Sequence, residues 1–297
     1  MTAAARPVID GGIVYLNGAF LRADEARVSV LDRGFLFGDG VYEVIPVYGG
    51  RLFRVEPHLA RLDRSLEGIR MANPLDHRQW TGVLRELVER NGGGERSIYL
   101  QVTRGVAPRD HAFPAQAEPT VFAMTTELPP SAPSPERQPG VEAISVEDIR
   151  WAHCDIKAIT LLPNVLMRQR ALESGAAEAI LLRDGQATEG AASNLFIVRG
   201  GVITTPPKGN LLLPGITRDL LVELCHREGL PCEEAPIFEA DLREAEELWV
   251  TSSTKEVVPV VRLDGVPVGD GRPGPVWRRM IDLYHSYKAA FREGRVE

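Results

Sequence analysis

The chain has 297 residues, 44% of them hydrophobic and 25% charged, which is the composition of an ordinary globular protein with enough core for two domains. A net charge of −7 disfavours general nucleic-acid binding, which requires a basic face, and no apolar run is long enough to span a bilayer. The three cysteines lack CxxC spacing, so they indicate neither a disulfide framework nor a metal cluster and fit a reducing cytoplasm.

The first part of the chain alternates strand-like and helical patterns. Residues 13–22 predict a hairpin with its turn at Asn17-Gly18, and residues 41–53 predict two strands joined at a Gly-Gly turn. The glycine-punctuated segment DRGFLFGDG before them is predicted to be irregular. Apolar residues spaced by three and four then predict helices over residues 56–70 and 79–90.

Two places in this part carry candidate binding side chains. Arg61 lies beside the apolar stripe of the first helix, from where it can reach past the core into a cavity; periodicity alone favours a solvent-facing arginine. Arg109 and His111 are two apart in the loop APRDHAFP, so in an extended loop they project to the same side and can bind one carboxylate together. The alternative for this pair is an exposed loop without a ligand.

A proline-rich segment divides the sequence. Prolines at 129, 130, 133, 135 and 139 predict a stiff linker over residues 128–140. We therefore expect a smaller N-terminal α/β domain over residues 1–127 and a larger C-terminal domain over residues 141–297.

The second domain again mixes helices and hairpins. Its patterns predict a helix over residues 163–174, a hairpin turn at Asp184-Gly185 and a C-terminal helix over residues 275–291. A further helix begins near Ile216, with Thr217 as a candidate N-cap. Free backbone N–H groups at a helix start suit a phosphate, although an ordinary capped helix is the alternative.

Lys157 stands out among the four lysines because it alone has apolar neighbours on both sides. Desolvation in such a segment disfavours the ammonium form and makes the amine available as a nucleophile. Glu189 follows at the end of the predicted hairpin, where its carboxylate can turn toward the same pocket. An amine together with a carboxylate aimed at a ring nitrogen is what pyridoxal phosphate chemistry requires.

Seven segments, in order along nearly the whole chain, resemble the fold-type IV pyridoxal-phosphate aminotransferases, and among them the D-amino acid (D-alanine) aminotransferases. They are DRGFLFGDGVYEV, EPHLARL, QVTRGVAPRDHAFP, VEDIRWAHCDIKAITLL, EAILLRDGQATEGAASNLF, PGITRD and ELWVTSSTKEVVPV. The Arg109-Asp110-His111 element points to the D-amino acid subgroup. The resemblance implies a two-domain α/β (α+β) fold with mixed sheets and packed helices, whose C-terminal domain carries Lys157 and most of the cofactor site.

The resemblance also implies a role for each candidate residue. Lys157 would be the catalytic residue, which forms the internal aldimine with pyridoxal 5′-phosphate and then moves a proton between substrate Cα and cofactor C4′. Glu189 would pair with the pyridine nitrogen. The remaining cofactor-binding residues, at the phosphate, would be Arg61, Ile216, Thr217 and Ser253. The substrate α-carboxylate would be bound by Tyr42, Arg109 and His111. In relatives the last two residues come from the neighbouring subunit, which implies a homodimer.

The implied reaction is ping-pong transamination of D-amino acids with 2-oxo acids, in which D-alanine and 2-oxoglutarate give pyruvate and D-glutamate. A branched-chain L-amino acid aminotransferase of the same fold would use Lys157 and Glu189 but not the Arg109/His111 pair. An aminodeoxychorismate lyase would release pyruvate without a 2-oxo acid acceptor, and a non-catalytic binding protein would bind no cofactor. Ala191 and Ala192 stand where relatives often carry serines, so weaker cofactor retention is expected.

Overall fold

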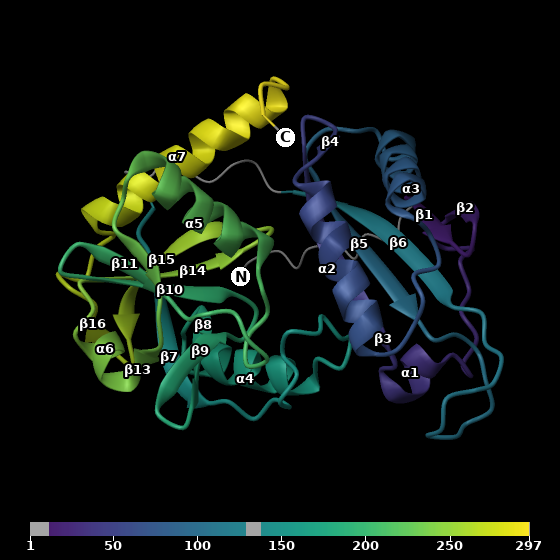
Figure 1. Cartoon of the computed structure of the whole chain (residues 1–297), viewed down its shortest axis with the longest axis horizontal. Helices are drawn as coiled ribbons and strands as arrows, with labels where there is room; N and C mark the ends of the chain where they lie inside the picture. The colour runs from purple at the N-terminus through teal and green to yellow at the C-terminus, as the bar shows by residue number, and fades with distance from the viewer. Residues whose placement is uncertain (1–11, 129–137, 297) are drawn as a thin grey trace. The chain divides into compact units, whose positions relative to one another are not determined.

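The structure is a computed structural model that describes residues 12–128 and 138–296, and these form two compact units (Figure 1). Most of the linker predicted at residues 128–140 lies outside the described residues. The first unit contains the described residues up to Leu128 together with Ile156–Thr160, and the second contains the other described residues. Lys157 therefore lies with the first unit, whereas the sequence placed it in the C-terminal domain.

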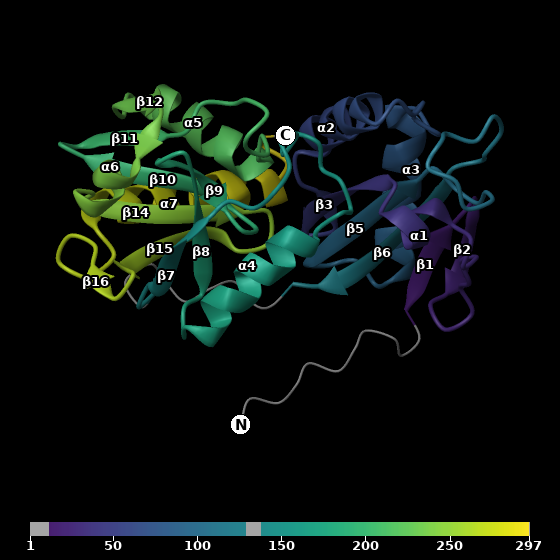
Figure 2. The same ribbon diagram turned by 90° about the horizontal axis from the view of Figure 1, so that it is seen from below.

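The first unit is built on an antiparallel sheet of six strands in the order β2-β1-β6-β5-β3-β4. Its elements in chain order are β1 (Ile13–Leu16), β2 (Ala19–Arg22), α1 (Arg33–Phe37), β3 (Gly40–Tyr48), β4 (Arg51–Leu52), α2 (Val55–Gly68), α3 (His77–Arg90), β5 (Arg96–Thr103) and β6 (Thr120–Glu127). The predicted hairpin at Asn17-Gly18 and the two predicted helices are confirmed. Figure 2 shows α2 and α3 on one face of this sheet.

The core of the first unit forms where α2 and α3 meet that face. Alternate residues of β3, among them Val41, Ile45 and Val47, pack against Leu59 and Leu62 of α2. Burial of such large side chains stabilises the unit by about 1.5–3 kcal/mol each. The core row of β3 also contains the charged residue Glu43, whose partners on α2 are described below.

One prediction for this unit was wrong, and one of the two alternatives for Arg61 is excluded. DRGFLFGDG is not irregular throughout, because residues Arg33–Phe37 form the short helix α1. The Asp32 side chain accepts a hydrogen bond from Gly34 N (2.7 Å), and Gly38 ends the helix in the left-handed conformation (φ 68°). Arg61 is not solvent-facing, since it is only 2% exposed.

His77 joins α3 to α2. Its Nδ1 lies 2.9 Å from Glu56 Oε2 and its Nε2 lies 2.7 Å from Asp63 Oδ2. Hydrogen bonds from these two carboxylates raise the pKa of His77 above its usual 6.5. The protonated imidazole therefore favours the folded state, most fully below about pH 6.5, and this contribution is lost as the pH rises through the raised pKa.

We therefore expect the stability difference between the wild type and His77→Gln to be largest in mild acid and to vanish at alkaline pH. Solvent screening keeps the difference below about 1 kcal/mol. Urea unfolding of both proteins at several pH values measures it. A difference that does not change with pH would show that the imidazole charge contributes nothing.

The second unit is built on a mixed sheet of ten strands, in the order β12-β11-β10-β14-β15-β7-β8-β9-β13, with β16 paired to β15. The pairs β7–β8, β7–β15 and β11–β12 are parallel. Its elements in chain order are β7 (Val141–Glu147), α4 (Leu162–Glu173), β8 (Glu178–Arg183), β9 (Gln186–Gly190), β10 (Asn194–Arg199), β11 (Val202–Thr205), α5 (Ile216–Glu228), β12 (Cys232–Glu234), β13 (Ile237–Phe238), α6 (Glu239–Arg243), β14 (Glu247–Ser252), β15 (Glu256–Leu263), β16 (Val266–Pro267) and α7 (Pro275–Arg292).

The predicted helices of the second unit and the turn at Asp184-Gly185 are confirmed. One lysine in this unit is more buried than its neighbours in sequence suggest: Lys288 of α7 is 4% exposed and forms an ion pair with Glu256 of β15. Apolar sequence neighbours were therefore not a sufficient guide to lysine burial. Among residues 12–128 and 138–296, no helix has the length and apolar character needed to cross a bilayer.

Candidate active site

Lys157 is held by its backbone next to β3. Tyr42 N donates a hydrogen bond to Lys157 O (2.9 Å), and Lys157 N donates one to Ser65 Oγ of α2 (3.1 Å). The flanking residue Ala158 forms a β-bridge with Val41, which explains why this segment belongs to the first unit. Within the described parts of the chain, Lys157 Nζ has no hydrogen bond or ion pair, and it lies 4.1 Å from the centre of the Tyr42 ring. The amine is therefore available for chemistry.

Tyr42 lies between Lys157 and a second aromatic ring. The rings of Tyr42 and Tyr99 are stacked with 5.7 Å between their centres, and Tyr99 Oη donates to Gln101 Oε1 (2.7 Å). Burial, together with the nearby Tyr42, raises the pKa of Tyr99 to about 12. Tyr99 therefore stays neutral at physiological pH and supports Tyr42 by packing.

Arg61 and His58 of α2 meet a buried carboxylate on β3. Glu43 Oε1 accepts from Arg61 Nε (2.7 Å), and Glu43 Oε2 accepts from Arg61 Nη2 (2.8 Å) and lies 2.7 Å from His58 Nδ1. Burial would raise the pKa of Glu43, but the charge and hydrogen bonds of Arg61 and the bond to His58 lower it below its usual range. Burial lowers the pKa of His58, so its neutral ring donates from Nδ1. This arrangement fixes the plane of the Arg61 guanidinium.

Arg109 and His111 are exposed and lie against the same ring. The Arg109 guanidinium carbon is 5.3 Å from the centre of the Phe37 ring, and the His111 ring centre is 5.4 Å from it. The structure thus places these two side chains against one ring, as the i and i+2 spacing predicted. A carboxylate near both would receive two donors.

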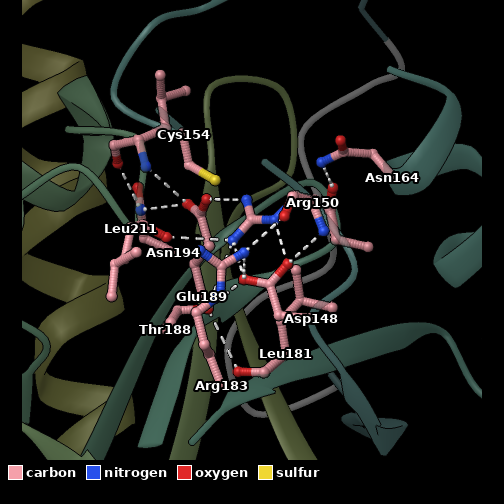
Figure 3. Close-up of polar contacts among 12 residues, drawn as sticks. Asp148, Arg150, Cys154, Asn164, Leu181, Arg183, Thr188, Glu189, Asn194 and Leu211 are labelled. Atoms are coloured by element: carbon pink, nitrogen blue, oxygen red, sulfur yellow. Dashed lines mark hydrogen bonds and ion pairs between the residues drawn. The ribbon is translucent and has the colours of Figure 1, made fainter. Parts of the chain in front are cut away.

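Glu189 lies on β9 in the second unit and is 4% exposed (Figure 3). Its Oε1 forms an ion pair with Arg150 Nη1. Its Oε2 accepts from Asn194 Nδ2 and from the backbone N–H of Leu213, both at 3.1 Å. These donors hold the carboxylate in one orientation.

Arg150 is fixed in turn by Asp148 (Figure 3). Arg150 Nε and Nη2 donate to the two carboxylate oxygens of Asp148, each at 2.9 Å, and Arg183 Nη2 lies 3.2 Å from Asp148 Oδ2. Burial would raise the pKa of Asp148, but the hydrogen bonds and charge of Arg150 outweigh burial and lower this pKa below its usual range. Burial would lower the pKa of Arg150, but the carboxylates of Asp148 and Glu189 together raise it. The guanidinium therefore stays charged beside Glu189. The sequence analysis did not identify Arg150. Its position two residues after Asp148 in VEDIRW was the sign in the sequence that these two side chains could pair.

The start of α5 carries Ile216 and Thr217, both buried. The N-cap is Gly215 rather than Thr217, which is a correction to the sequence prediction. A Cβ atom at Gly215 would lie 1.9 Å from Asn194 Oδ1, so only glycine fits there. Ser253 lies in the turn between β14 and β15 and is half-buried.

The chain matches the family model of class IV aminotransferases over residues 40–263. This chain is a class IV aminotransferase. A D-alanine aminotransferase from Bacillus licheniformis is 43% identical to it over 267 residues, which are 90% of this chain and 94% of the relative. The family and the fold predicted from the sequence are thereby confirmed.

Two solved structures resemble this aminotransferase over 97% of its length and 96% of theirs. One is the branched-chain amino acid aminotransferase of Escherichia coli, with a TM-score of 0.89 and 26% identity. The other is the branched-chain aminotransferase of the thermophilic archaeon Thermoproteus uzoniensis with norvaline, with a TM-score of 0.86 and 26% identity. They establish the fold-type IV architecture.

Class IV aminotransferases use pyridoxal 5′-phosphate, and the residues of this aminotransferase fit that cofactor. Lys157 supplies an amine that has no hydrogen bond or ion pair within the described residues, and Glu189 supplies a buried, oriented carboxylate. Thr251 pairs with Asn194 across β14 and β10, and within the described residues its buried Oγ1 has no hydrogen-bond partner. A buried hydroxyl without a partner is costly, so a ligand that bonds to it would be favoured.

Proposed function

We propose that this aminotransferase transfers amino groups between D-amino acids and 2-oxo acids, with D-alanine and 2-oxoglutarate giving pyruvate and D-glutamate. The observation that carries this proposal is the Arg109 and His111 pair beside the Phe37 ring, which suits a substrate α-carboxylate. The D-alanine aminotransferase at 43% identity supports it more strongly than the two branched-chain enzymes, both at 26% identity, support the L-specific alternative.

The proposed roles follow from the surroundings of each residue. Lys157, whose amine has no hydrogen bond or ion pair in the described residues and lies over the Tyr42 ring, would take up and return the proton of the substrate Cα. Pyridoxal 5′-phosphate, when bound, would supply a sink for the electrons of the Cα–H bond, and the Glu189 carboxylate would pair with its ring nitrogen. The phosphate would be held by the remaining cofactor-binding residues, Arg61, Ile216, Thr217 and Ser253. The carboxylate is held by Tyr42, Arg109 and His111, and the side on which it is held relative to Lys157 selects the D-enantiomer.

The visible absorbance of the purified protein tests this proposal. D-Alanine should remove the yellow absorbance in a half-reaction, and L-leucine should leave it unchanged. Loss of absorbance with L-leucine alone would assign the chain to the branched-chain enzymes and remove Arg109 and His111 from the substrate site. Pyruvate release from aminodeoxychorismate without a 2-oxo acid acceptor would instead identify a lyase.

We further propose a homodimer in the cytoplasm. Leu162, Val165 and Leu166 are exposed on one face of α4, where their spacing places them side by side. A face of this kind typically marks a protein contact, and a second copy is the occupant that the resemblance indicates. All three cysteines are free thiols, which suits a reducing compartment.

Shared active sites in such a dimer predict complementation. Lys157→Ala and Arg109→Ala should each be inactive or nearly so as homodimers. A heterodimer of the two, isolated through two different affinity tags, should recover about half of the wild-type activity, because one of its two sites then has both intact residues. If Arg109 serves its own subunit, no site in the heterodimer is intact, and the activity is about half that of the Arg109→Ala homodimer because only one of the two sites retains Lys157.

A further inference from the structure

The loop that carries Arg109 and His111 is exposed, yet a buried side chain holds its backbone. Arg33 of α1 is 3% exposed, and its Nη1 donates to Asp110 O (2.6 Å) and to Ala112 O (3.4 Å). These two carbonyl groups flank His111 on either side. A single guanidinium therefore fixes the backbone on both sides of a proposed substrate-binding residue.

A carboxylate links Arg33 to a second buried arginine. Asp39 Oδ2 accepts from Arg33 Nε and from Arg104 Nε, both at 2.8 Å. Burial would raise the pKa of Asp39, but Arg104 and Arg33 together lower it, so the carboxylate stays charged at neutral pH. The Arg104 guanidinium also lies 3.8 Å from the centre of the Phe113 ring, at the far end of the loop. The loop is thus attached at its middle and at its end to the same charged network.

Phe37 is the ring around which three nitrogen-bearing side chains of this region lie. It ends α1, and three such groups surround its ring centre: Arg33 at 4.8 Å, Arg109 at 5.3 Å and the His111 ring at 5.4 Å. The aromatic face attracts the Arg109 guanidinium electrostatically and packs against the tilted His111 ring, so Phe37 favours rotamers in which Arg109 and His111 converge. The capped geometry of α1 fixes where the ring stands.

We propose that Phe37 and Arg33 are positioning residues, which preform the carboxylate-binding geometry of Arg109 and His111 before substrate arrives. This inference rests on the proposed function, because it assigns a purpose to a site for the substrate carboxylate. Preorganisation reduces the ordering that binding must impose on these side chains. Loss of the ring should therefore weaken substrate binding and leave the chemical step almost unchanged.

Phe37→Leu tests the proposal in the holoenzyme. The KM for D-alanine should rise about tenfold while kcat changes by less than about twofold, because two side chains lose their shared contact. Phe37→Tyr should retain the wild-type KM. Phe20→Leu is the matched control, because Arg90 lies over the Phe20 ring at 4.6 Å in the same kind of contact on other elements. An unchanged KM in Phe37→Leu, or an equal rise in Phe20→Leu, would overturn the proposal.

A double-mutant cycle shows whether Phe37 acts through Arg109. Arg109→Met alone should raise KM strongly, and adding Phe37→Leu should then raise it by much less than tenfold, since residues that act as a unit are not additive. Additive effects would overturn the positioning role.

Hydrogen exchange separates failure of this inference from failure of the proposed function. Backbone amides of residues 107–113 should exchange faster in Phe37→Leu and in Arg33→Gln than in the wild-type holoenzyme, with the exchange of β5 and β6 unchanged. This readout holds whether or not D-alanine is a substrate. Unchanged exchange in residues 107–113 of both variants would show that the loop is held by other contacts and would overturn the inference.

Discussion

Lys157→Ala should abolish transamination and leave the protein folded. Without the amine, no group at this position can move the substrate Cα proton, so turnover should fall by at least about a thousandfold. The fold should survive because Ser65 Oγ and Tyr42 N bond to the backbone of Lys157, which alanine retains. Steady-state kinetics with D-alanine and 2-oxoglutarate, together with thermal unfolding, measure both results.

Lys208→Ala is the matched control for the loss of a lysine. Lys208 forms an ion pair with Asp219 and its side chain is 48% exposed. This variant should keep wild-type turnover. Turnover of Lys157→Ala within about tenfold of the wild type would remove Lys157 from the proposed chemistry.

Local periodicity was enough to predict the longer helices and the hairpins, but not the short helices α1 and α6, and it failed where distant residues decide the outcome. A helical repeat gives the angular position of Arg61 on α2, which lies beside the apolar stripe. It does not reveal that Glu43 of β3 stands opposite, and that carboxylate is what allows the guanidinium to be buried. A charged residue in the apolar row of β3 was the one sign of the pairing in the sequence.

The motif order predicted the family, but not the surroundings of its residues. Lys157 was assigned to the second domain because of its place in the chain, whereas bonds to β3 and α2 attach its segment to the first unit. Thr217 was a reasonable N-cap by residue type; Gly215 takes that position because Asn194 leaves room for no side chain. Each difference comes from a contact between residues that are far apart in sequence.

Arg150→Met should both destabilise the second unit and slow catalysis. It leaves Glu189 and Asp148 buried without the guanidinium that they share, and loss of one partner from a buried ion pair costs about 3–5 kcal/mol. Glu189 would also lose the ion pair that orients it, so kcat should fall by about tenfold or more, as for other groups preorganised in a low-dielectric site. Urea unfolding and steady-state kinetics measure the two effects.

The pH dependence identifies the cause of the destabilisation. The pKa of Asp148 is lowered in the folded protein, so its contribution to stability is present above the usual value of 3.8 and is lost as the pH falls through the lowered pKa. The difference in unfolding free energy between the wild type and Arg150→Met should therefore narrow in acid. Arg183→Met removes one contact with Asp148 at 3.2 Å and the hydrogen bonds to the backbone carbonyls of Arg150 and Trp151, but it leaves the ion pair between Arg150 and Glu189 intact. This variant should therefore cost less and leave kcat nearly unchanged. Equal losses of stability and of kcat in the two variants would show that packing rather than the shared charge holds Glu189 in place. A difference in unfolding free energy that does not narrow in acid would show the same.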